Sequence, residues 1–385
     1  MRRRSVDAID LSCLAAQPSL AVARFVESQS RTSASSWQPA SPDDLASLHE
    51  AAAHWYEHRF GCALDPDTEF TFAPNAVVGL TFLCLSFIEA GDMVLLPDPG
   101  ARYYRGAAVL CGGGLIPYYL TEKGQFHPQW GALQASLVGR LRLVVLSSPH
   151  NPTTSTIDRA GYSEAIGFAR RNQTLLVNDA GFAFASTPHS RPESLLSAPF
   201  ASGVGVEIAS MEANFGFPGL GLALVCGNRE AISAVRFLRE SSQWAPSSGS
   251  VRLAATLLMN GEAFLRDRVS ALAQTRTLIT KTVEEIGWRP LSAPSVPFIW
   301  ISVPARIGAE AFCRRMLRRT GVLMSPGTDF GERGEGFVRI VLPEDQKTAE
   351  LVAERLRRHA KLYQRRLPRR LPLGQRARKH HHDES

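Results

Sequence analysis

Short apolar runs alternate with amphipathic stretches along the first two thirds of the chain. Between about residues 43 and 225, each apolar run ends in polar or turn residues, and helical patterns lie between the runs. This alternation is typical of a mostly parallel sheet that is covered by helices. The predicted strands are 93–97, 115–120, 141–146, 174–179, 205–210 and 222–226, and the predicted helices include 76–90, 103–111, 159–171 and 229–239.

The pattern changes near residue 248. A long helical stretch over 248–286 precedes two predicted strands, 297–303 and 336–342, with helices interleaved at 308–320 and 347–358. This order predicts a smaller α+β domain attached by a long helix. The expected division is an N-terminal segment packing on the small domain (1–40), a large α/β domain (41–250), a small α+β domain that includes the connecting helix (251–364) and a basic tail (365–385).

Composition and charge exclude several classes of protein. The 385 residues are 44% hydrophobic and 21% charged, which is ordinary for a globular chain and excludes a disordered or collagen-like one. The net charge is +7, but residues 365–385 alone carry +5, from seven Lys/Arg and two Asp/Glu. We expect that tail to be disordered and solvated, because it lacks apolar periodicity. The excess charge therefore gives no reason to expect a nucleic-acid partner.

Membrane, metal and disulfide chemistry are not expected either. The sequence has no apolar run of membrane-spanning length and no hydrophobic signal core after the N-terminal arginines, so we expect a cytoplasmic protein. The six cysteines are scattered without a CxxC pair and are typical of small buried hydrophobes. We predict no metal site.

Candidate chemistry gathers where the predicted strands end. Polar clusters follow three of them, at 147–153, 178–179 and 210–212. Because ligands of open α/β sheets bind beyond the carboxyl ends of the strands, these side chains are the first candidates for a site. Asp179 there has two interpretations: its carboxylate neutralises a cationic ligand group, or it caps a nearby helix or loop.

Several segments, taken in order, resemble motifs of the class I/II aminotransferases, the fold-type-I enzymes built around pyridoxal 5′-phosphate (PLP). They are IDLS at 9–12, EAGDMVLLPDPG at 89–100 for "PGDxVLxPDPGY", SPHNPT at 148–153 for "NPHNPTG", VND at 177–179, SMEANFGFPGLGL at 210–222 for "SxSKxFGxPGLRxG", SPGTDFG at 325–331 and GFVRI at 336–340. The resemblance implies aminotransferase fold type I: an α/β large domain with a mostly parallel sheet and helices on both faces, plus a smaller α+β C-terminal domain. It also implies a homodimer.

The resemblance implies what remains of a PLP site. Asp179 takes the position that binds the pyridinium nitrogen, and Asn151 the position that binds the ring's O3′. For the phosphate, Ser210 persists, and Asn75 and Ala76 begin the helix that supplies its donors. Arg339 takes the position that binds the substrate α-carboxylate, with an ion pair to a neighbouring acid as the alternative interpretation.

Four positions depart from the family pattern. The Schiff-base lysine falls on Ala213, and the tyrosine that bonds O3′ falls on Phe182. The ring-stacking tyrosine is Ala101, and the arginine that pairs with the phosphate is Gly221. The five lysines of the chain are Lys123, Lys281, Lys347, Lys361 and Lys379. None lies between 123 and 281, the interval that contains position 213, so a slip of alignment does not explain the lost lysine.

Glu212 is an acid beside the vacated lysine position, and two interpretations stay open. If its side chain faces the site, it is a candidate acid/base or binds an ammonium group. If it faces the flank of the sheet, it is a salt-bridge partner.

Three functions follow as hypotheses. The leading one is an aminotransferase-like protein repurposed, in specialised metabolism, for a different reaction on an amino-acid-like or keto-acid-like carboxylate, without a Schiff base to the protein. The second is an enzyme that uses PLP or pyridoxamine phosphate (PMP) non-covalently, for half-transamination or dehydration. The third is a catalytically silent homologue that acts as a partner or regulator. We expect no covalently bound cofactor, and a small carboxylate-bearing metabolite as the ligand.

Overall fold

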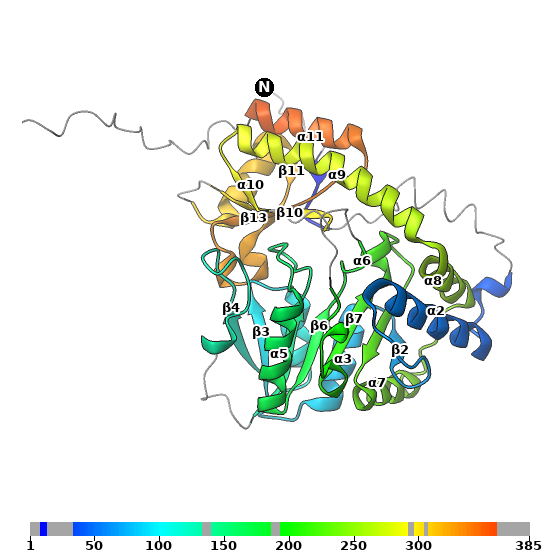
Figure 1. Ribbon diagram of the computed structural model, residues 1–385. Coiled ribbons are helices and arrows are strands. Elements are labelled where there is room, and N and C mark those ends of the chain that lie inside the picture. The colour runs from blue at the N-terminus through cyan, green and yellow to red at the C-terminus, as the bar shows by residue number, and fades with distance from the viewer. Residues whose placement is uncertain are drawn as a thin grey trace, which may run out of the picture.

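The computed structural model describes residues 8–13, 34–132, 140–185, 193–291, 296–303 and 307–359. Among these residues, the strands form a seven-stranded sheet, a four-stranded sheet and a two-stranded ribbon. In Figure 1 the seven-stranded sheet and its helices fill the lower part of the molecule, and the four-stranded sheet lies above it under α9 and α11. The predicted tail, 365–385, lies outside the described residues.

The seven-stranded sheet has the order β2-β8-β7-β6-β5-β3-β4. Its strands from β3 to β7 run parallel, and β8 runs antiparallel to both of its neighbours. The mostly parallel sheet predicted from the sequence is therefore confirmed. The strands are β2 (Phe70–Ala73), β3 (Met93–Asp98), β4 (Gly114–Tyr119), β5 (Leu141–Ser147), β6 (Leu175–Asp179), β7 (Gly205–Ser210) and β8 (Ala223–Gly227).

Helices cover both faces of this sheet, each over its own apolar core. One core joins the sheet to α2, α5 and α8, and the other joins it to α3, α4 and α7. These helices are α2 (Pro42–Phe60), α3 (Ala76–Phe87), α4 (Arg102–Leu110), α5 (Arg159–Asn172), α7 (Arg229–Ser241) and α8 (Ser248–Asn260). A sheet buried on both faces explains why its strands are nearly continuous apolar runs.

Local sequence signals set the ends of α2. The Ser41 hydroxyl accepts from the amide of Asp44 at 3.1 Å, and the Asp44 carboxylate accepts from the amide of Ser41 at 3.0 Å, which is a capping box. Pro42 follows at the first helical position, where its missing N–H costs nothing. Gly61 ends the helix in the left-handed region at φ 64°.

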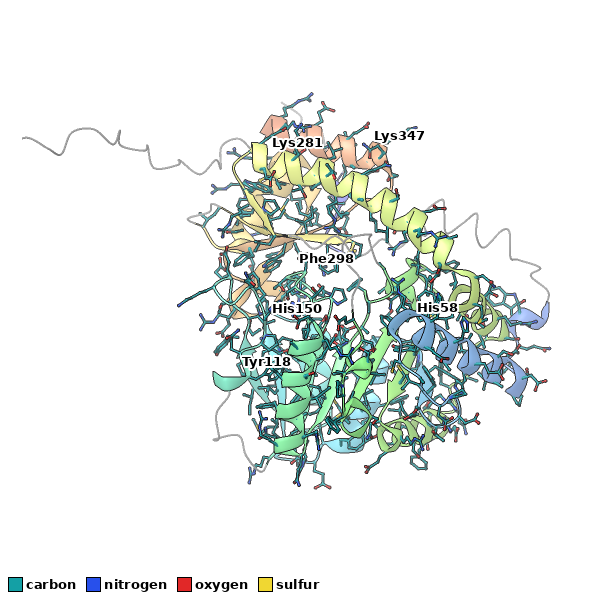
Figure 2. The ribbon with its side chains drawn as sticks, in the orientation of Figure 1. His58, Tyr118, His150, Lys281, Phe298 and Lys347 are labelled. Atoms are coloured by element: carbon teal, nitrogen blue, oxygen red, sulfur yellow. The ribbon has the colours of Figure 1, made fainter. Side chains whose placement is uncertain are left out.

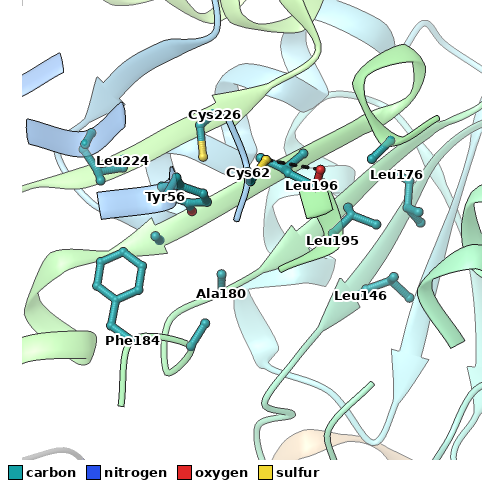
Figure 3. Packing of buried hydrophobic residues seen from close by; sticks show 14 of the residues in the cluster. Tyr56, Cys62, Leu146, Leu176, Ala180, Phe184, Leu195, Leu196, Leu224 and Cys226 are labelled. Carbon is teal, nitrogen blue, oxygen red and sulfur yellow. Dashed lines mark hydrogen bonds between the residues drawn. The ribbon is translucent and has the colours of Figure 1, made fainter. Parts of the chain in front are cut away.

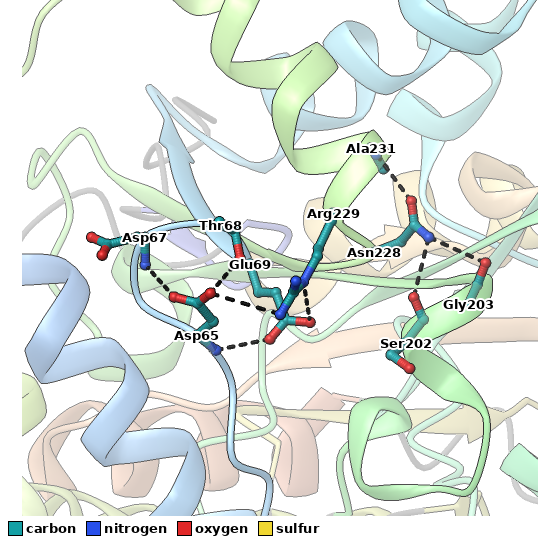
Figure 4. A network of polar contacts seen from close by, with 9 residues as sticks. All are labelled: Asp65, Asp67, Thr68, Glu69, Ser202, Gly203, Asn228, Arg229 and Ala231. Carbon is teal, nitrogen blue, oxygen red and sulfur yellow. Dashed lines mark hydrogen bonds and ion pairs between the residues drawn. The ribbon is translucent and has the colours of Figure 1, made fainter.

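A charged network fixes the segment that leads into β2 (Figure 4). Arg229, at the start of α7, pairs with Glu69 at 3.4 Å and with Asp65 at 3.7 Å. Asn228 caps the same helix by accepting from the amide of Ala231 at 3.0 Å. These contacts join β2 to α7. No strand was predicted at β2, because its segment is only four residues long and Thr71 interrupts the apolar run.

The structure has two helices where the sequence predicted one long connecting helix. That prediction was wrong at the residue between them, Gly261. The first helix, α8, ends at Asn260, and α9 (Glu262–Glu285) begins after Gly261. A Cβ atom at Gly261 would lie 2.2 Å from the carbonyl oxygen of Leu257, so only glycine fits this bend. The apolar periodicity continues through the bend, which is why it predicted a single element.

The four-stranded sheet has the order β12-β13-β10-β9 and is antiparallel. Apolar residues of α9, α10 and α11 pack on it in a core of their own. The short strand β1 (Ile9–Asp10) runs parallel to β11 (Val322–Leu323) beside this core. The remaining elements here are β9 (Arg289–Leu291), β10 (Phe298–Ser302), α10 (Ala309–Thr320), β12 (Ser325–Pro326), β13 (Phe337–Val341) and α11 (Gln346–His359).

The two larger sheets are joined at the end of β3. The buried carboxylate of Asp98 accepts from the amides of Arg333 at 3.1 Å and Glu332 at 3.3 Å. A Cβ atom at Gly331 would lie 2.1 Å from this carboxylate, and the φ of 135° at Gly331 also favours glycine. This contact brings the segment before β13 to the carboxyl edge of the parallel strands.

Short helical turns complete the described structure. They are η1 (Ala34–Trp37), η2 (Trp130–Ala132), η4 (Leu195–Ser197), η5 (Ala201–Gly203), α6 (Met211–Phe215), η6 (Gly327–Phe330) and η7 (Glu332–Gly334). Among the helices of the described ranges, we find none with an apolar stretch of membrane-spanning length.

Figure 3 shows part of the larger core, where Tyr56 and Phe184 pack over the sheet. Phe184 makes edge-to-face contacts with Tyr56 and Phe215 and is fully buried.

We predict that Phe184→Ala lowers the free energy of unfolding by about 3 to 5 kcal/mol, because the cost of the cavity adds to the lost transfer free energy of the ring. Urea unfolding measures the change. Leu110→Ala, at a residue that is 78% exposed, serves as the control. Equal losses in the two variants would contradict the prediction.

Candidate functional site

Side chains from both larger sheets meet at the carboxyl edge of the parallel strands. Ser147 at the end of β5 pairs in register with Asp179 at the end of β6, and β7 ends nearby at Ser210. Asn151 follows β5 in the loop, and Arg339 comes from β13 of the four-stranded sheet. The carboxyl edge predicted from the sequence is therefore where these candidates gather.

Arg339 is a buried cation. Its Nη1 donates to the Asn151 amide oxygen at 2.8 Å, and its Nη2 donates to the backbone oxygen of Ser12 at 2.7 Å. The guanidinium lies over the ring of Phe330, 4.7 Å from its centroid. Only 9% of the residue is exposed, and burial lowers the pKa of Arg339 to about 10. Within the described residues, the Nε–H has no acceptor. A cation that is buried with an unused donor is suited to bind an anion.

Asp179 is held by two tyrosines. Its Oδ2 accepts from the hydroxyl of Tyr104 at 2.6 Å and also from the hydroxyl of Tyr103, and its Oδ1 accepts from the amide of Gly181 at 3.1 Å. Burial raises the pKa of Asp179, and these three donors act in the opposite direction. The contact with Gly181 agrees with the second interpretation above, in which the carboxylate caps a nearby loop, and the carboxylate lies buried at the sheet edge.

The two tyrosines were missed by the sequence reasoning. They lie in the first turn of α4, which directly follows β3, so the topology brings them to the same edge as Asp179. The signal was present in the segment ARYYR at 101–105, where the tyrosines lie two and three residues beyond the expected ring-stacking position.

Ser210 and its neighbours build a short helix after β7. The Ser210 hydroxyl accepts from the amide of Ala213 at 3.2 Å and so caps α6. Asn214 donates to the backbone oxygen of Ala180 at 3.0 Å and accepts from the amide of Phe184 at 2.8 Å. These bonds fix α6 against the loop after β6.

Ala213 faces an apolar cluster. It packs against a group that contains Phe182, Phe298, Val296 and Val341. The rings of Phe182 and Phe298 meet edge to face, with centroids 5.2 Å apart. The positions that the family fills with lysine and tyrosine are thus in apolar surroundings.

The Glu212 carboxylate is bound by backbone amides. Its Oε1 accepts from the backbone amides of Gly219 and Gly221, each at 3.0 Å. The reason is the left-handed Gly216, with φ 68°, which ends α6 and turns the following residues back over it. Glu212 is therefore bound by the backbone of its own turn.

Asn75 and Ala76 lie along the same edge. Ala223 of β8 pairs with Ala73 of β2 on one side and with Ser210 on the other, so β2 and β7 end together. The Asn75 side chain accepts from the amide of Val78 at 2.9 Å and caps α3, which begins at Ala76. The oxygen of this amide is therefore engaged in capping.

The lysines lie elsewhere in the described structure. Figure 2 shows Lys281 on α9 and Lys347 on α11, both on the far side of the four-stranded sheet from His150 and Phe298. Lys123 is exposed after β4. Lys361 and Lys379 lie outside the described residues.

The polar groups fit one end of PLP and not the other. A buried carboxylate and an amide, Asp179 and Asn151, have the chemistry for the ring nitrogen and the ring oxygen. At the phosphate end, the Glu212 carboxylate is bonded to the amide of Gly221, the position where the family has its phosphate-pairing arginine. A phosphate dianion would meet a negative charge there. As arranged in this structure, the residues do not fit the phosphate.

Comparison with known proteins gives a match over most of the chain. A family model described as aminotransferase class I and II matches residues 15–356. The chain is 31% identical over 320 residues to an LL-diaminopimelate aminotransferase of Desulforudis audaxviator. This match covers 81% of this chain and 80% of that protein. It is 29% identical over 318 residues to the protein of the same name from Natranaerobius thermophilus, with 82% and 81% covered.

Solved structures show the same fold. A probable N-succinyldiaminopimelate aminotransferase of Thermus thermophilus superposes with a TM-score of 0.81 at 25% identity, covering 93% of this chain and 96% of that one. An aminotransferase from Staphylococcus aureus gives a TM-score of 0.83 at 22% identity, with 93% and 95% covered. The α/β architecture of aminotransferase fold type I, expected from the motifs, is confirmed.

The comparisons contradict the expected change of function. The sequence led us to expect a repurposed protein or a silent homologue, because Ala213 stands where the family has lysine. The relatives that match over four fifths of their length are named as ordinary aminotransferases, and nothing among them supports a different reaction. The expectation took the changes at four family positions as the loss of the reaction, and the similarity of the whole chain does not support that step.

The tyrosine contacts generate a pH-dependent prediction. Removing the Tyr104 hydroxyl raises the folded-state pKa of Asp179 further, so stability is lost as the pH rises through that pKa. We predict that Tyr104→Phe costs about 1.5 to 3 kcal/mol of unfolding free energy where Asp179 is ionised, and less where it is protonated.

Urea unfolding at a series of pH values on both sides of the Asp179 titration measures this difference. The matched control is Tyr118→Phe, because that buried hydroxyl donates to the backbone oxygen of Val145 at 2.8 Å, a group that does not titrate. Its loss should be equal at all these pH values. A pH-independent loss in Tyr104→Phe would contradict the assignment.

Proposed function

Since this chain belongs to the class I and II aminotransferase family, we propose that it transfers an amino group between an amino acid and a keto acid, with Arg339 binding the α-carboxylate of each. The observation that carries the proposal is the buried guanidinium with its free Nε–H. A carboxylate there gains a charge-assisted hydrogen bond from a donor that burial has already removed from water.

The neighbours of Arg339 support this role by fixing its orientation. Asn151 and the backbone of Ser12 each accept from a different terminal nitrogen, so the plane of the guanidinium is set before a ligand arrives. The ring of Phe330 covers one face of that plane. A planar donor held in one orientation suits a carboxylate, whose two oxygens are also coplanar.

The relatives' names supply the first substrate to test. They are named for LL-diaminopimelate, a compound with two amino-acid ends. We propose an amino acid of this class, with one α-carboxylate on Arg339. We further propose that the protein acts as a cytoplasmic homodimer, and that the site lies between a large domain over residues 41–250 and a small domain over 251–364.

The cofactor of this family is PLP, and we propose that a vitamin B6 group is held here without a covalent bond to the protein. Ala213 has no amine, and the lysines of the described residues lie on α9, on α11 and after β4. Asp179, Asn151 and Ser210 are the residues proposed to hold the group, and the reacting amine then comes with the ligand itself. Asn75 and Ala76 are proposed to border it at the start of α3.

Carboxylate binding predicts a shift in thermal stability. LL-diaminopimelate should raise the melting temperature by about 2 °C or more at saturation, because a ligand that binds only the folded state stabilises it. The fully decarboxylated analogue 1,5-diaminopentane should give no shift. Arg339→Gln should remove the response, and Arg314→Gln, at an exposed arginine of α10 paired with Glu310, should keep it. A full shift in Arg339→Gln would show that the carboxylate binds elsewhere.

Non-covalent binding makes a separate prediction. Borohydride fixes a Schiff base between an aldehyde and an amine, so treatment of the wild type with pyridoxal, the unphosphorylated aldehyde, and borohydride should leave no lysine modified stoichiometrically. Mass spectrometry of the proteolytic peptides makes the measurement. Ala213→Lys supplies the missing amine and is the positive control. Stoichiometric labelling of any of the five native lysines would refute non-covalent binding.

A further inference from the structure

The turn that follows α6 binds an acid at positions that resemble the family's phosphate-binding motif. From the geometry of this turn we propose that Glu212 takes the place of the cofactor's phosphate, so that the site prefers vitamin B6 compounds with a free 5′-hydroxymethyl group over their 5′-phosphates. The inference rests on the proposed function, specifically on a B6 ring held by Asp179 and Asn151. It assigns Glu212 as the residue that sets this preference.

Two backbone amides of the turn point to the same oxygen atom. The amide of Phe217 donates to the backbone oxygen of Glu212 at 3.0 Å, which closes the turn over α6. Gly219 and Gly221 then adopt φ values of 86° and 67°, in the left-handed region that favours glycine. Their two N–H groups converge on Glu212 Oε1 at 3.0 Å each. Converging backbone amides of this kind form a typical anion-binding concavity.

The anion in this concavity belongs to the protein. A phosphate that enters has to displace a carboxylate attached to the same turn, which is present at high effective concentration. In the family motif, position 212 is a serine and position 221 an arginine, whereas this chain has an acid and a glycine. The two replacements remove a positive charge and add a negative one at the same place. Both changes disfavour a dianion.

The same geometry favours a hydroxyl. Both amides bind Oε1, so Oε2 is the oxygen that would accept a hydrogen bond from a ligand. A 5′-hydroxymethyl group has one O–H to donate, and a carboxylate acceptor strengthens such a bond. The unphosphorylated compound therefore satisfies Glu212, whereas the phosphate is repelled by it.

The test is a pair of affinities. Pyridoxamine and PMP differ only in the phosphate, so the ratio of their dissociation constants isolates the effect of the 5′ group. Both are measured by calorimetric titration of the purified protein. We expect the wild type to bind pyridoxamine about tenfold more tightly than PMP or better. Glu212→Gln, which keeps the size and removes the charge, should reduce that ratio to about threefold or less, or reverse it.

Two further variants make the result specific. Glu230→Gln changes a glutamate in the first turn of α7 that is exposed to solvent, and it should leave the ratio as in the wild type. Glu212→Ser restores the residue of the family motif and should shift the ratio in the same direction as Glu212→Gln. The serine variant replaces the glutamine variant in the test if the latter does not fold. Circular dichroism measures whether each variant is folded.

The opposite results overturn the inference. Tighter binding of PMP than of pyridoxamine by the wild type, or the same ratio in Glu212→Gln and Glu212→Ser as in the wild type, would show that Glu212 does not select. Absence of binding of both compounds to all variants would overturn it as well. These results do not bear on carboxylate binding at Arg339, which the thermal measurement with Arg339→Gln tests independently.

Discussion

The site depends on one buried cation. The guanidinium of Arg339 bonds to Asn151 from the parallel sheet and to the backbone of Ser12 from the N-terminal segment, while its own strand belongs to the four-stranded sheet. Three parts of the chain that are far apart in sequence therefore meet at one side chain. Burying a charge is costly, and its hydrogen bonds offset that cost only in part, as the lowered pKa of Arg339 indicates. An anionic ligand would complete the compensation.

The other polar groups of the site are already satisfied by the chain. Asp179 is held by two tyrosine hydroxyls, and Glu212 by the two glycine amides. Ala213 lies against an apolar cluster. Arg339 Nε, in contrast, still lacks an acceptor among the described residues, which suits a ligand that brings a carboxylate to it.

The sequence predicted the fold well because the strands of a sheet that is covered on both faces are nearly continuous apolar runs. It failed where one residue decides the backbone, as at Gly261, and where a strand is as short as β2. In the site, Asn151 could be located because it lies in a polar cluster after a predicted strand, and Arg339 because its segment resembles a family motif. The partners of Glu212 could not, since backbone amides have no residue signature. The function was inferred wrongly, because the lysine position was weighed above the similarity of the whole chain.

The most direct test of the account is a crystal structure of the protein with a bound keto acid. The account predicts that the α-carboxylate lies within hydrogen-bonding distance of Arg339 Nε, with Asn151 and Ser12 still bonded to the same guanidinium. A keto acid bound elsewhere, with Arg339 Nε still without an acceptor, would contradict the claim that this buried cation is the substrate anchor.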